Sequence, residues 1–269
     1  MHPLIFGFPA FIIVLPFAVA VGTALPLSLS ARHRAARWEA LLALLLALTL
    51  IAVAGAKLYS FAERGELGSL NEEIGTGFRY PGGILAVLMA APLLWALLPI
   101  GIPFAALLDC MAPGIGVAMA VMRVHCLLSG CCTGWACAHA WCIPYPHESP
   151  PFQHQMIDGL ILPSAALSLP VHPLPIYFMV ASLIAAGVAL WLLPRAQYAG
   201  QTFLVFMVLH EGAKFGLEYL RYPAAPLVQS GSLAVALGAI AVLIVVQLRG
   251  KAETGAARGH EPREMREGT

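Results

Sequence analysis

Charged residues are scarce in this sequence. Asp, Glu, Lys and Arg together make up 11% of its 269 residues, against about 25% in an average soluble domain. Apolar residues make up 59% of the chain, and the net charge is +1. This balance excludes a disordered chain and an ordinary soluble enzyme. It also lacks the basic surface that nucleic-acid binding needs. The composition predicts an all-α integral membrane protein with several spans.

Several familiar sequence signals are also missing. No period of 20–50 residues repeats along the chain, so a repeat array is excluded. Six cysteines are too few for a disulfide scaffold, and no Cys-x-x-Cys motif followed by a second one gives a standard zinc spacing. The first apolar stretch, from Pro3 to Leu29, has no basic residues ahead of it and is too long for the apolar core of a signal peptide. We therefore interpret it as a membrane span.

Seven segments are long and apolar enough to be spans, for which about 20 residues are needed. Two of them share residues 82 to about 128 and are separated by a break. The others are residues 1–31, 39–61, 173–193, 201–221 and 227–248. The break is predicted at Pro99–Pro103, because two prolines and a glycine stop a helix. This division gives a seven-span domain, 1–248, with two long loops, 62–82 and 129–171. The charged, Gly/Ala-rich tail, 249–269, is predicted to be disordered.

The positions of Lys and Arg predict an orientation, because basic residues gather on the cytoplasmic side. An odd number of spans places the termini on opposite sides. We expect an external N-terminus, a cytoplasmic C-terminus and two external long loops. The expected cytoplasmic side holds Arg32, Arg34, Arg37, Arg195, Arg249, Lys251, Arg258, Arg263 and Arg266, whereas the other side holds Arg64, Arg79 and Arg221.

The fourth span contains two charges, Asp109 and Arg123. A charge at the centre of a membrane helix costs about 2.5–3.5 kcal/mol on insertion scales, and it usually faces a polar site inside the bundle. Helical geometry places both side chains on one face, about 21 Å apart, so they cannot pair with each other. Simpler roles remain open: Asp109 can cap a helix or meet its dipole, and Arg123 can snorkel to the interface.

The sixth span carries a charged stripe, Glu211, Lys214, Glu218 and Arg221. At 100° per residue the four side chains fall within about 80° of one helix face. Their spacing allows ion pairs three or four residues apart, so a ladder that satisfies itself is one interpretation. The other is a cationic pocket, shaped by carboxylates, for an anionic lipid headgroup.

Five of the six cysteines follow the fourth span, at positions 126, 131, 132, 137 and 142. Three interpretations are open: structural disulfides in an oxidising loop, small packing residues, or a metal or redox site. Gly130 and Gly134 flank the Cys131–Cys132 pair and indicate a backbone that turns sharply or approaches a ligand closely. The sixth cysteine, Cys110, is predicted to lie in the core.

These segments resemble the bacterial prolipoprotein diacylglyceryl transferases over about residues 80–221. The resemblance uses four motifs in order. Arg123, Gly130 and Gly134 match the family's G-R-x-G-N-F-x-N-G-E-x-x-G, with Asp109 and Pro113 upstream. Pro81-Gly82-Gly83 resembles H-G-G, His172-Pro173 with Tyr177 resembles H-P-[ST]-Q-L-Y-E, and Lys214-Phe215 with Glu218 and Arg221 resembles R-F-x-x-E-x-x-R.

The sequence departs from these motifs at chemically important positions. Cys126, Ser129 and Cys131 stand where the family has Asn, Asn and Glu, and Lys214 replaces an Arg. Pro175 and Phe178 replace the Gln and the final Glu of the H-P motif. Pro81 replaces a histidine that is a proposed catalytic base of the family, and proline cannot accept a proton. Tyr80 or His172 would have to take its place. The chain therefore looks like a divergent, Cys-rich relative.

The resemblance implies transfer of a diacylglyceryl group from phosphatidylglycerol to a cysteine thiol of a lipoprotein precursor, in the bacterial inner membrane. It implies no cofactor and no metal. The residues expected to be catalytic are Arg123, His172, Tyr80 and Lys214; those expected to bind substrate are Arg123, Gly134, Lys214, Glu218, Arg221, Tyr177, Gly82 and Gly83.

Two other functions remain open at this point. A membrane thiol redox or metal-handling protein would use Cys131, Cys132 and the nearby histidines. A catalytically inactive relative would bind the lipid without transferring its diacylglyceryl group. The partners expected for the main interpretation are the bilayer, phosphatidylglycerol and a precursor whose signal peptide carries a lipobox cysteine.

Overall fold

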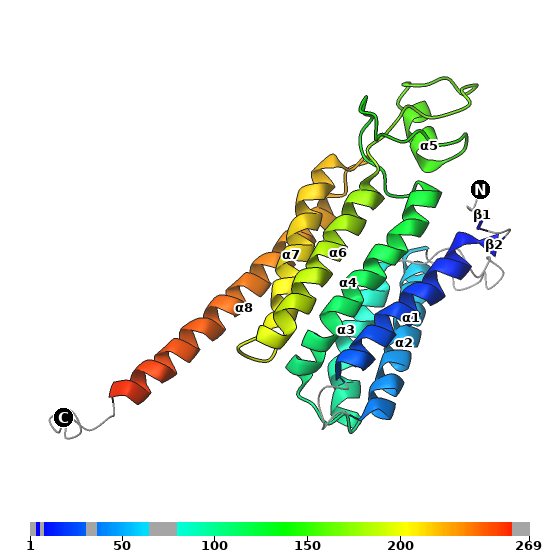
Figure 1. Ribbon diagram of the computed structural model, residues 1–269. Helices are drawn as coiled ribbons and strands as arrows, with labels where there is room; N and C mark the ends of the chain where they lie inside the picture. The colour runs from blue at the N-terminus through cyan, green and yellow to red at the C-terminus, as the bar shows by residue number, and fades with distance from the viewer. Residues whose placement is uncertain (1–3, 6–7, 31–36, 65–79, 260–269) are drawn as a thin grey trace, which may run out of the picture.

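The protein is a bundle of long helices, as a computed structural model shows (Figure 1). The structure describes residues 4–5, 8–30, 37–64 and 80–259. The helices are α1 (Ala10–Ser30), α2 (Trp38–Arg64), α3 (Tyr80–Leu97), α4 (Phe104–Ser129), α5 (Pro150–Ile157), α6 (Leu174–Leu192), α7 (Gln201–Leu217) and α8 (Pro226–Gly259), with 3₁₀ turns η1 (Leu193–Arg195) and η2 (Glu218–Leu220). A small antiparallel pair, β1 (Leu4–Ile5) and β2 (Phe8–Pro9), precedes α1. The helical class is confirmed.

In the part of the chain that the structure describes, four segments are long and apolar enough to cross a membrane: Trp38–Tyr59, Phe104–Ser129, Leu174–Arg195 and Pro226–Leu248. Among the described residues, Phe17–Pro26 and Gly82–Leu97 form shorter apolar helices. α7 carries Glu211 and Lys214 within its length, which lowers its hydropathy. A multi-span helical protein is therefore supported, whereas the count of seven spans and the two long external loops are not confirmed. The loop predicted at 62–82 falls largely on residues 65–79, which lie outside the described residues.

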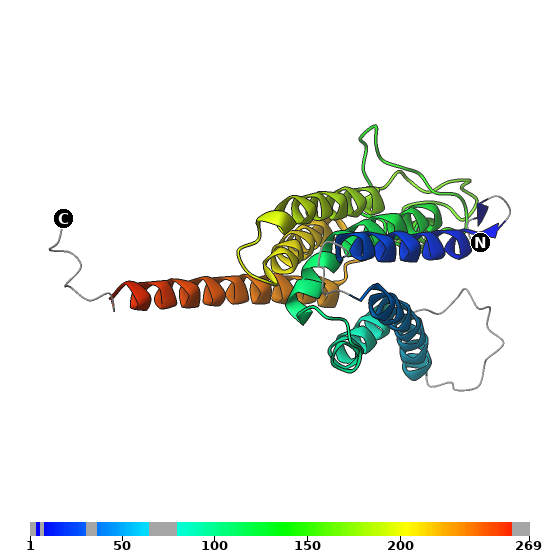
Figure 2. The ribbon, with the colours of Figure 1, turned by 60° about the horizontal axis from the view of Figure 1, so that its bottom comes forward.

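α4 lies at the centre of the bundle. It packs against α1 on one side and against α6 and α7 on the other, and α8 packs along α7 (Figures 1 and 2). Figure 1 places the start of α1 and the end of α8 at opposite ends of the molecule, with α5 at the end where α1 begins. The segment between α3 and α4, from Leu98 to Pro103, is not helical, which confirms the predicted break.

Small side chains allow α4, α6 and α7 to approach closely. Ala112, Ala185, Ala189 and Phe206 form the buried cluster between them, each at most 1% exposed. A Cβ added to Gly116 would lie 2.9 Å from the Ala186 Cβ. Lipid tails are as apolar as the side chains, so close van der Waals packing rather than the hydrophobic effect drives helix association in a membrane.

α2 and α3 form a hairpin that packs by the same means. A Cβ on Gly82 would clash with the Tyr59 Cβ and the Gly55 oxygen, and one on Gly83 would lie 2.8 Å from the Ala52 oxygen. The hairpin packs its leucines against the connection to α4, where Ile100, Ile102 and Leu107 are buried. Gly82 and Gly83 thus have a structural role in this helix contact.

Asp109 caps a helix other than its own. Its Oδ2 accepts a hydrogen bond from the Gly200 N–H at 2.6 Å, and its Oδ1 accepts one from the Phe203 N–H at 2.8 Å. These are orphan donors at the N-terminus of α7, where a carboxylate also interacts favourably with the helix dipole. The capping role that the sequence left open is confirmed, and the cap fixes the register of α7 against α4.

Replacing Asp109 by Ala should lower the free energy of unfolding by about 2 kcal/mol, because it leaves two N–H donors without acceptors in a site where the carboxylate is 5% exposed. Thermal unfolding of the detergent-solubilised chain measures the effect. Glu39→Gln, at an exposed position in the first turn of α2, is the matched control, and its effect should be within a few tenths of a kcal/mol. Equal loss in both variants would show that the cap is unimportant.

Two helix ends differ from the predicted boundaries. α7 ends at Leu217 and passes through η2, so Arg221 is already extended, with φ −75° and ψ 141°. The stripe therefore does not continue as one α-helix to its last member. α8 runs to Gly259, so the predicted tail, 249–269, begins as a continuation of that helix. Residues 260–269 lie outside the described residues.

Candidate functional site

The site begins where α4 ends, at Gly130. This residue has φ 67° and ψ 14° and forms the left-handed C-cap of α4, a conformation that glycine adopts without the steric cost of a Cβ. A Cβ there would also lie 3.0 Å from Tyr145 Cδ1 and 3.1 Å from Pro151 Cδ. The Tyr145 hydroxyl donates a hydrogen bond to the Leu127 oxygen at 2.9 Å. The turn predicted at Gly130 is confirmed.

Gly134 joins three segments that are distant in the sequence. Its N–H donates to the His172 oxygen at 3.0 Å, and the His172 N–H donates to the Trp135 oxygen at 3.1 Å. On the other edge, the Trp135 N–H donates to the Leu220 oxygen at 3.0 Å, and the Tyr222 N–H donates to the Thr133 oxygen at 3.1 Å. We call this arrangement of residues 133–135, 172 and 220–222 the Gly134 ladder.

Only glycine fits at the centre of the Gly134 ladder. A Cβ at position 134 would lie 2.5 Å from the Leu220 oxygen and 2.8 Å from the His172 Cβ. Contacts that short require backbone atoms to move. Gly134 was predicted at a sharp turn or a close approach to a ligand, whereas in the structure it closely approaches the residue 172 and 220 segments. As a consequence, the segments carrying His172 and Arg221 flank the chain that leaves α4.

Arg221 is held by a buried carboxylate. Its Nη1 donates to Glu218 Oε1 at 2.9 Å and to Oε2 at 3.2 Å, and the Glu218 side chain is only 2% exposed. Its Nη2 lies 3.9 Å from Cys132 Sγ. Glu218 thus fixes the orientation of the guanidinium through Nη1, and a planar guanidinium has further N–H donors that suit a second anion.

His172 and Arg123 have partners on α6. His172 Nδ1 lies 3.2 Å from the Tyr177 hydroxyl, so two residues matched to the H-P motif are in contact. The Arg123 guanidinium lies over the Phe178 ring, 4.5 Å from its centroid, in a cation–π contact. Arg123, in α4, is half-buried, so its side chain is partly covered by the neighbouring helices.

Lys214 belongs to a separate polar cluster in the interior of α7. Its Nζ donates to Glu211 Oε2 at 3.3 Å, and Glu211 Oε1 lies 3.1 Å from His210 Nδ1. All three residues are buried, at 6–9% exposure. The predicted pairs Glu211–Lys214 and Glu218–Arg221 are both formed, so the ladder interpretation of the charged stripe holds at the level of these contacts.

The H-G-G-like segment, Pro81-Gly82-Gly83, is not part of the Gly134 ladder. Gly82 and Gly83 meet α2, as described above. Tyr80 begins α3, but its side chain, like that of Pro81, lies outside the residues whose side chains are described. The roles predicted for Tyr80, Gly82 and Gly83 in substrate binding or catalysis therefore remain predictions.

The cysteines divide into a bridged pair and a thiol cluster. Cys137 and Cys142 form a disulfide, so the structural-disulfide interpretation is confirmed for these two. Cys126, Cys131 and Cys132 are free, and their sulfur atoms lie within 4.8 Å of one another. Hydrogen bonds from the Cys126 and Cys132 thiols hold the pKa of Cys131 well below its usual range, and the charge of Arg123 acts in the same direction.

Cys131 should therefore react with iodoacetamide in acidic solution. An ordinary thiol loses about tenfold in rate for each pH unit below its pKa, because only the thiolate is nucleophilic. We expect the alkylation rate of Cys131 to fall less than about threefold between pH 8 and pH 6, as followed by mass spectrometry. Cys126→Ala removes a hydrogen-bond donor and should restore the steep pH dependence. A steep profile in the unmodified chain would contradict the predicted shift.

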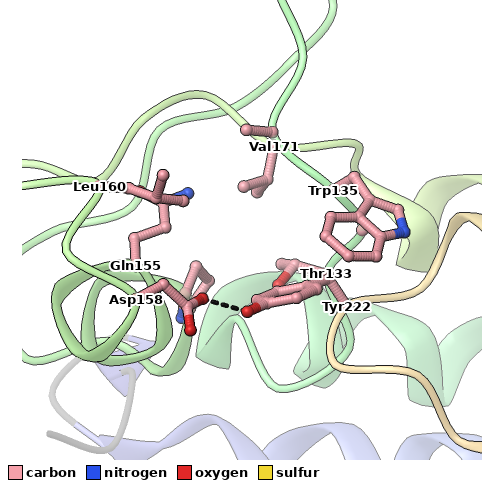
Figure 3. A pocket seen from close by; sticks show the side chains of 10 residues that line it. Thr133, Trp135, Gln155, Asp158, Leu160, Val171 and Tyr222 are labelled. Atoms are coloured by element: carbon pink, nitrogen blue, oxygen red, sulfur yellow. Dashed lines mark hydrogen bonds between the residues drawn. The ribbon is translucent and has the colours of Figure 1, made fainter.

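A cavity of about 250 Å³ opens beside the Gly134 ladder (Figure 3). Trp135 and Tyr222 form one wall, with ring centroids 4.3 Å apart. The Tyr222 hydroxyl donates a hydrogen bond to Asp158, just after α5, across the floor. The lining is largely apolar and comprises Thr133, Gly134, Trp135, Ala136, Pro151, Gln155, Asp158, Leu160, Val171 and Tyr222.

Sequence reasoning did not identify this cavity. Gly134 was predicted, but Trp135, Asp158 and Tyr222 were not, because they come from three separate segments with no common spacing. Gln155 fixes the cavity wall: its amide accepts from the Leu169 N–H at 2.7 Å and donates to the Leu169 oxygen at 3.3 Å.

At the end of α4, the Arg221 guanidinium can meet an anion beside a group of thiols, and His172 lies on the other edge of the Gly134 ladder. A model of the family described as "Prolipoprotein diacylglyceryl transferase" matches residues 6–249. The chain belongs to the prolipoprotein diacylglyceryl transferase family. The match extends from before α1 into α8 and contains every residue of the Gly134 ladder.

Two curated members of the family are similar to this chain. Phosphatidylglycerol–prolipoprotein diacylglyceryl transferase 2 of Clostridium perfringens is 25% identical over 155 residues, which is 55% of this chain and 55% of that protein. Phosphatidylglycerol–prolipoprotein diacylglyceryl transferase of Clostridium tetani is 25% identical over 118 residues, 43% of this chain and 41% of that protein. The chain spans about half the length of the curated relatives it matches.

Proposed function

We propose that this family member transfers a diacylglyceryl group from phosphatidylglycerol to the thiol of a cysteine in a lipoprotein precursor. The observation that carries the proposal is the Gly134 ladder, which holds the segments of His172 and Arg221 on either side of the chain leaving α4. The names of the two clostridial relatives supply the lipid donor and the protein acceptor. A lipobox cysteine is the acceptor that we infer.

Arg221 would bind the phosphate of the lipid headgroup. Its orientation is fixed by Glu218, which occupies Nη1, and a planar guanidinium suits phosphate oxygens. Arg123, held over Phe178, would add a second cation near the end of α4. Two cations in a region of low dielectric also stabilise the negative charge that builds on the departing phosphate.

The reaction balances without a cofactor. The acceptor thiol gives up its proton, and the thiolate sulfur attacks the glyceryl carbon that carries the phosphate. A C–S bond forms, the C–O bond to the phosphate breaks, and glycerol phosphate leaves with the bonding electron pair. The product is a thioether between the precursor cysteine and diacylglycerol. Catalysis then requires a base for the thiol and cations for the leaving group.

His172 is the base that we infer. Its Nδ1 lies 3.2 Å from the Tyr177 hydroxyl, which leaves the other ring nitrogen to accept the thiol proton when Tyr177 orients the ring. Its backbone is fixed in the Gly134 ladder at both N–H and carbonyl. Lys214 is buried with Glu211 and His210. Its predicted role, as a third cation for the phosphate and the leaving group, stays a prediction.

We also infer seven spans in the bacterial plasma membrane, with an external N-terminus and a cytoplasmic C-terminus. Basic residues at 195 and beyond 248 support this orientation. It places the Gly134 ladder at the external end, since Figure 1 shows α5 at the end of the molecule opposite the end of α8. Labelling of Cys131 in intact cells with a membrane-impermeant maleimide tests the orientation.

The deciding experiment is incubation of the purified full chain with phosphatidylglycerol labelled in its acyl chains and a peptide containing a lipobox cysteine. Mass spectrometry should show the peptide gaining one diacylglyceryl group, with release of glycerol phosphate. A peptide with Ser in place of the cysteine is the control. Phosphatidylglycerol binding without transfer would refute the proposed activity and support the alternative of an inactive lipid-binding relative.

A further inference from the structure

The thiol cluster is a feature that diacylglyceryl transfer does not use. Cys126 is in the last turn of α4, and Cys131 and Cys132 follow the left-handed turn at Gly130. That turn returns the chain toward the helix end, so residues five and six positions apart meet. The sulfurs of Cys131 and Cys132 lie 3.6 Å apart, and all three sulfurs lie within 4.8 Å of one another.

We propose that Cys126, Cys131 and Cys132 form a binding site for a soft monovalent metal ion, copper(I). Zinc–thiolate bonds are about 2.3 Å long, so three sulfurs around one ion of this size lie about 3.8–4.0 Å apart. The three sulfurs already have nearly this spacing. Small rotations of the side chains would therefore complete the site without movement of the backbone.

The number and type of ligands favour copper(I) over zinc. Structural zinc sites have four ligands, whereas the group formed here by the described residues offers three, all of them thiol sulfurs. Thiolates are soft ligands, which select soft ions such as copper(I). Cys131 is exposed, and Cys126 and Cys132 are half-buried, so an ion can reach the cluster from the surface.

The charges around the cluster match a metal–thiolate complex. Three thiolates and one copper(I) ion carry a net charge of −2. Arg221 Nη2 lies 3.9 Å from Cys132 Sγ, and Arg123 precedes Cys126 by one helical turn on α4. Two guanidinium groups would therefore compensate that charge. The other group of possible ligands, Cys137, Cys142 and His172, has both of its sulfurs in the disulfide.

This inference does not rest on the proposed function, because copper binding needs neither phosphatidylglycerol nor transfer. The test uses the full chain in detergent, prepared without oxygen and free of reductant. Copper(I) is titrated against a chromophoric copper(I) chelator. We expect one copper(I) per chain, with only sulfur neighbours in the X-ray absorption spectrum of the copper.

Variants identify the ligands. The triple variant Cys126→Ser/Cys131→Ser/Cys132→Ser should lose the bound copper(I), and each single variant should weaken binding at least tenfold. Cys110→Ser is the matched control, because Cys110 is a free cysteine buried elsewhere in α4. It should retain one copper(I). Unchanged stoichiometry in the triple variant would overturn the site.

A second measurement uses the unmodified chain, so its outcome does not depend on whether the variants fold. In the unmodified chain, bound copper(I) should protect Cys126, Cys131 and Cys132 together from alkylation, as mass spectrometry of their shared peptide would show. Alkylation at unchanged rates in the presence of copper(I) would overturn the proposal. Zinc(II) is titrated in parallel, and binding of zinc(II) in preference to copper(I) by the same thiols would overturn the assignment of the ion.

Discussion

Replacing Arg221 by Gln should reduce diacylglyceryl transfer by at least about 100-fold, equivalent to about 2.7 kcal/mol of transition-state stabilisation. The guanidinium is the cation that Glu218 fixes beside the Gly134 ladder. Gln cannot neutralise a phosphate, so the charge that develops on the departing glycerol phosphate would lose its partner. Initial rates with labelled phosphatidylglycerol and a lipobox peptide measure the loss.

The Arg221 variant needs a control for stability, because it leaves the Glu218 carboxylate buried at 2% side-chain exposure without its ion pair. Breaking a buried pair by removing one partner can cost about 3–5 kcal/mol of stability. The double variant Glu218→Gln/Arg221→Gln removes both charges and should recover most of that stability while transfer stays low. Recovery of transfer in the double variant would show that Arg221 acts through folding.

Two further variants separate charge from geometry at this position. Arg221→Lys keeps the charge but loses the planar fork, so it should retain part of the transfer activity. Arg195→Gln removes an arginine of the η1 turn, where the side chain is exposed and lies over Trp191. Its transfer rate should equal that of the unmodified chain. A similar loss in Arg195→Gln would indicate a general effect of net charge.

Replacing Gly134 by Ala should destabilise the Gly134 ladder and reduce transfer together. The new Cβ would meet the Leu220 oxygen at 2.5 Å and the His172 Cβ at 2.8 Å. Backbone on both sides must then move apart, and overpacking of this kind costs about 1–3 kcal/mol. Because the same contacts position His172 and Arg221, we expect transfer to fall by more than about tenfold even where the chain remains folded.

Thermal unfolding and transfer rates, measured on the same preparations, test this expectation. Gly187→Ala is the matched control, since a Cβ at this position in α6 meets no atom within 4 Å. It should leave transfer unchanged and stabilise the chain slightly, because Ala favours helix more than Gly does. Full stability and full transfer in Gly134→Ala would contradict the close backbone contacts at Gly134.

The sequence predicted the helical bundle and several of its boundaries for local reasons. The Pro99–Pro103 break stops a helix wherever it occurs, and the Leu174–Leu192 helix lies within one residue of its predicted limits, 173–193. Charge spacing also predicted the Glu211–Lys214 and Glu218–Arg221 pairs, because neighbours three residues apart meet on one helix or on the 3₁₀ turn that follows it.

Other features depend on contacts between distant segments. Asp109 was recognised as a candidate cap, but its partners at Gly200 and Phe203 lie in the turn before α7 and in its first turn. Nothing in the spacing identifies them. The predicted stripe to Arg221 assumed a continuous α-helix, whereas the chain changes to a 3₁₀ turn and then extends to join the Gly134 ladder. That pairing satisfies backbone groups that a longer helix would have satisfied internally.

The sequence by itself determined that this is an apolar, helical, multi-span chain of the diacylglyceryl transferase type, because hydropathy and short motifs act over neighbouring residues. The tertiary structure decided which functional groups meet. It placed His172 and Arg221 on opposite edges of the Gly134 segment, and it gathered three thiols at the end of α4. Such meetings depend on the left-handed turn at Gly130 and on close backbone approach, which are properties of the folded chain rather than of any local pattern.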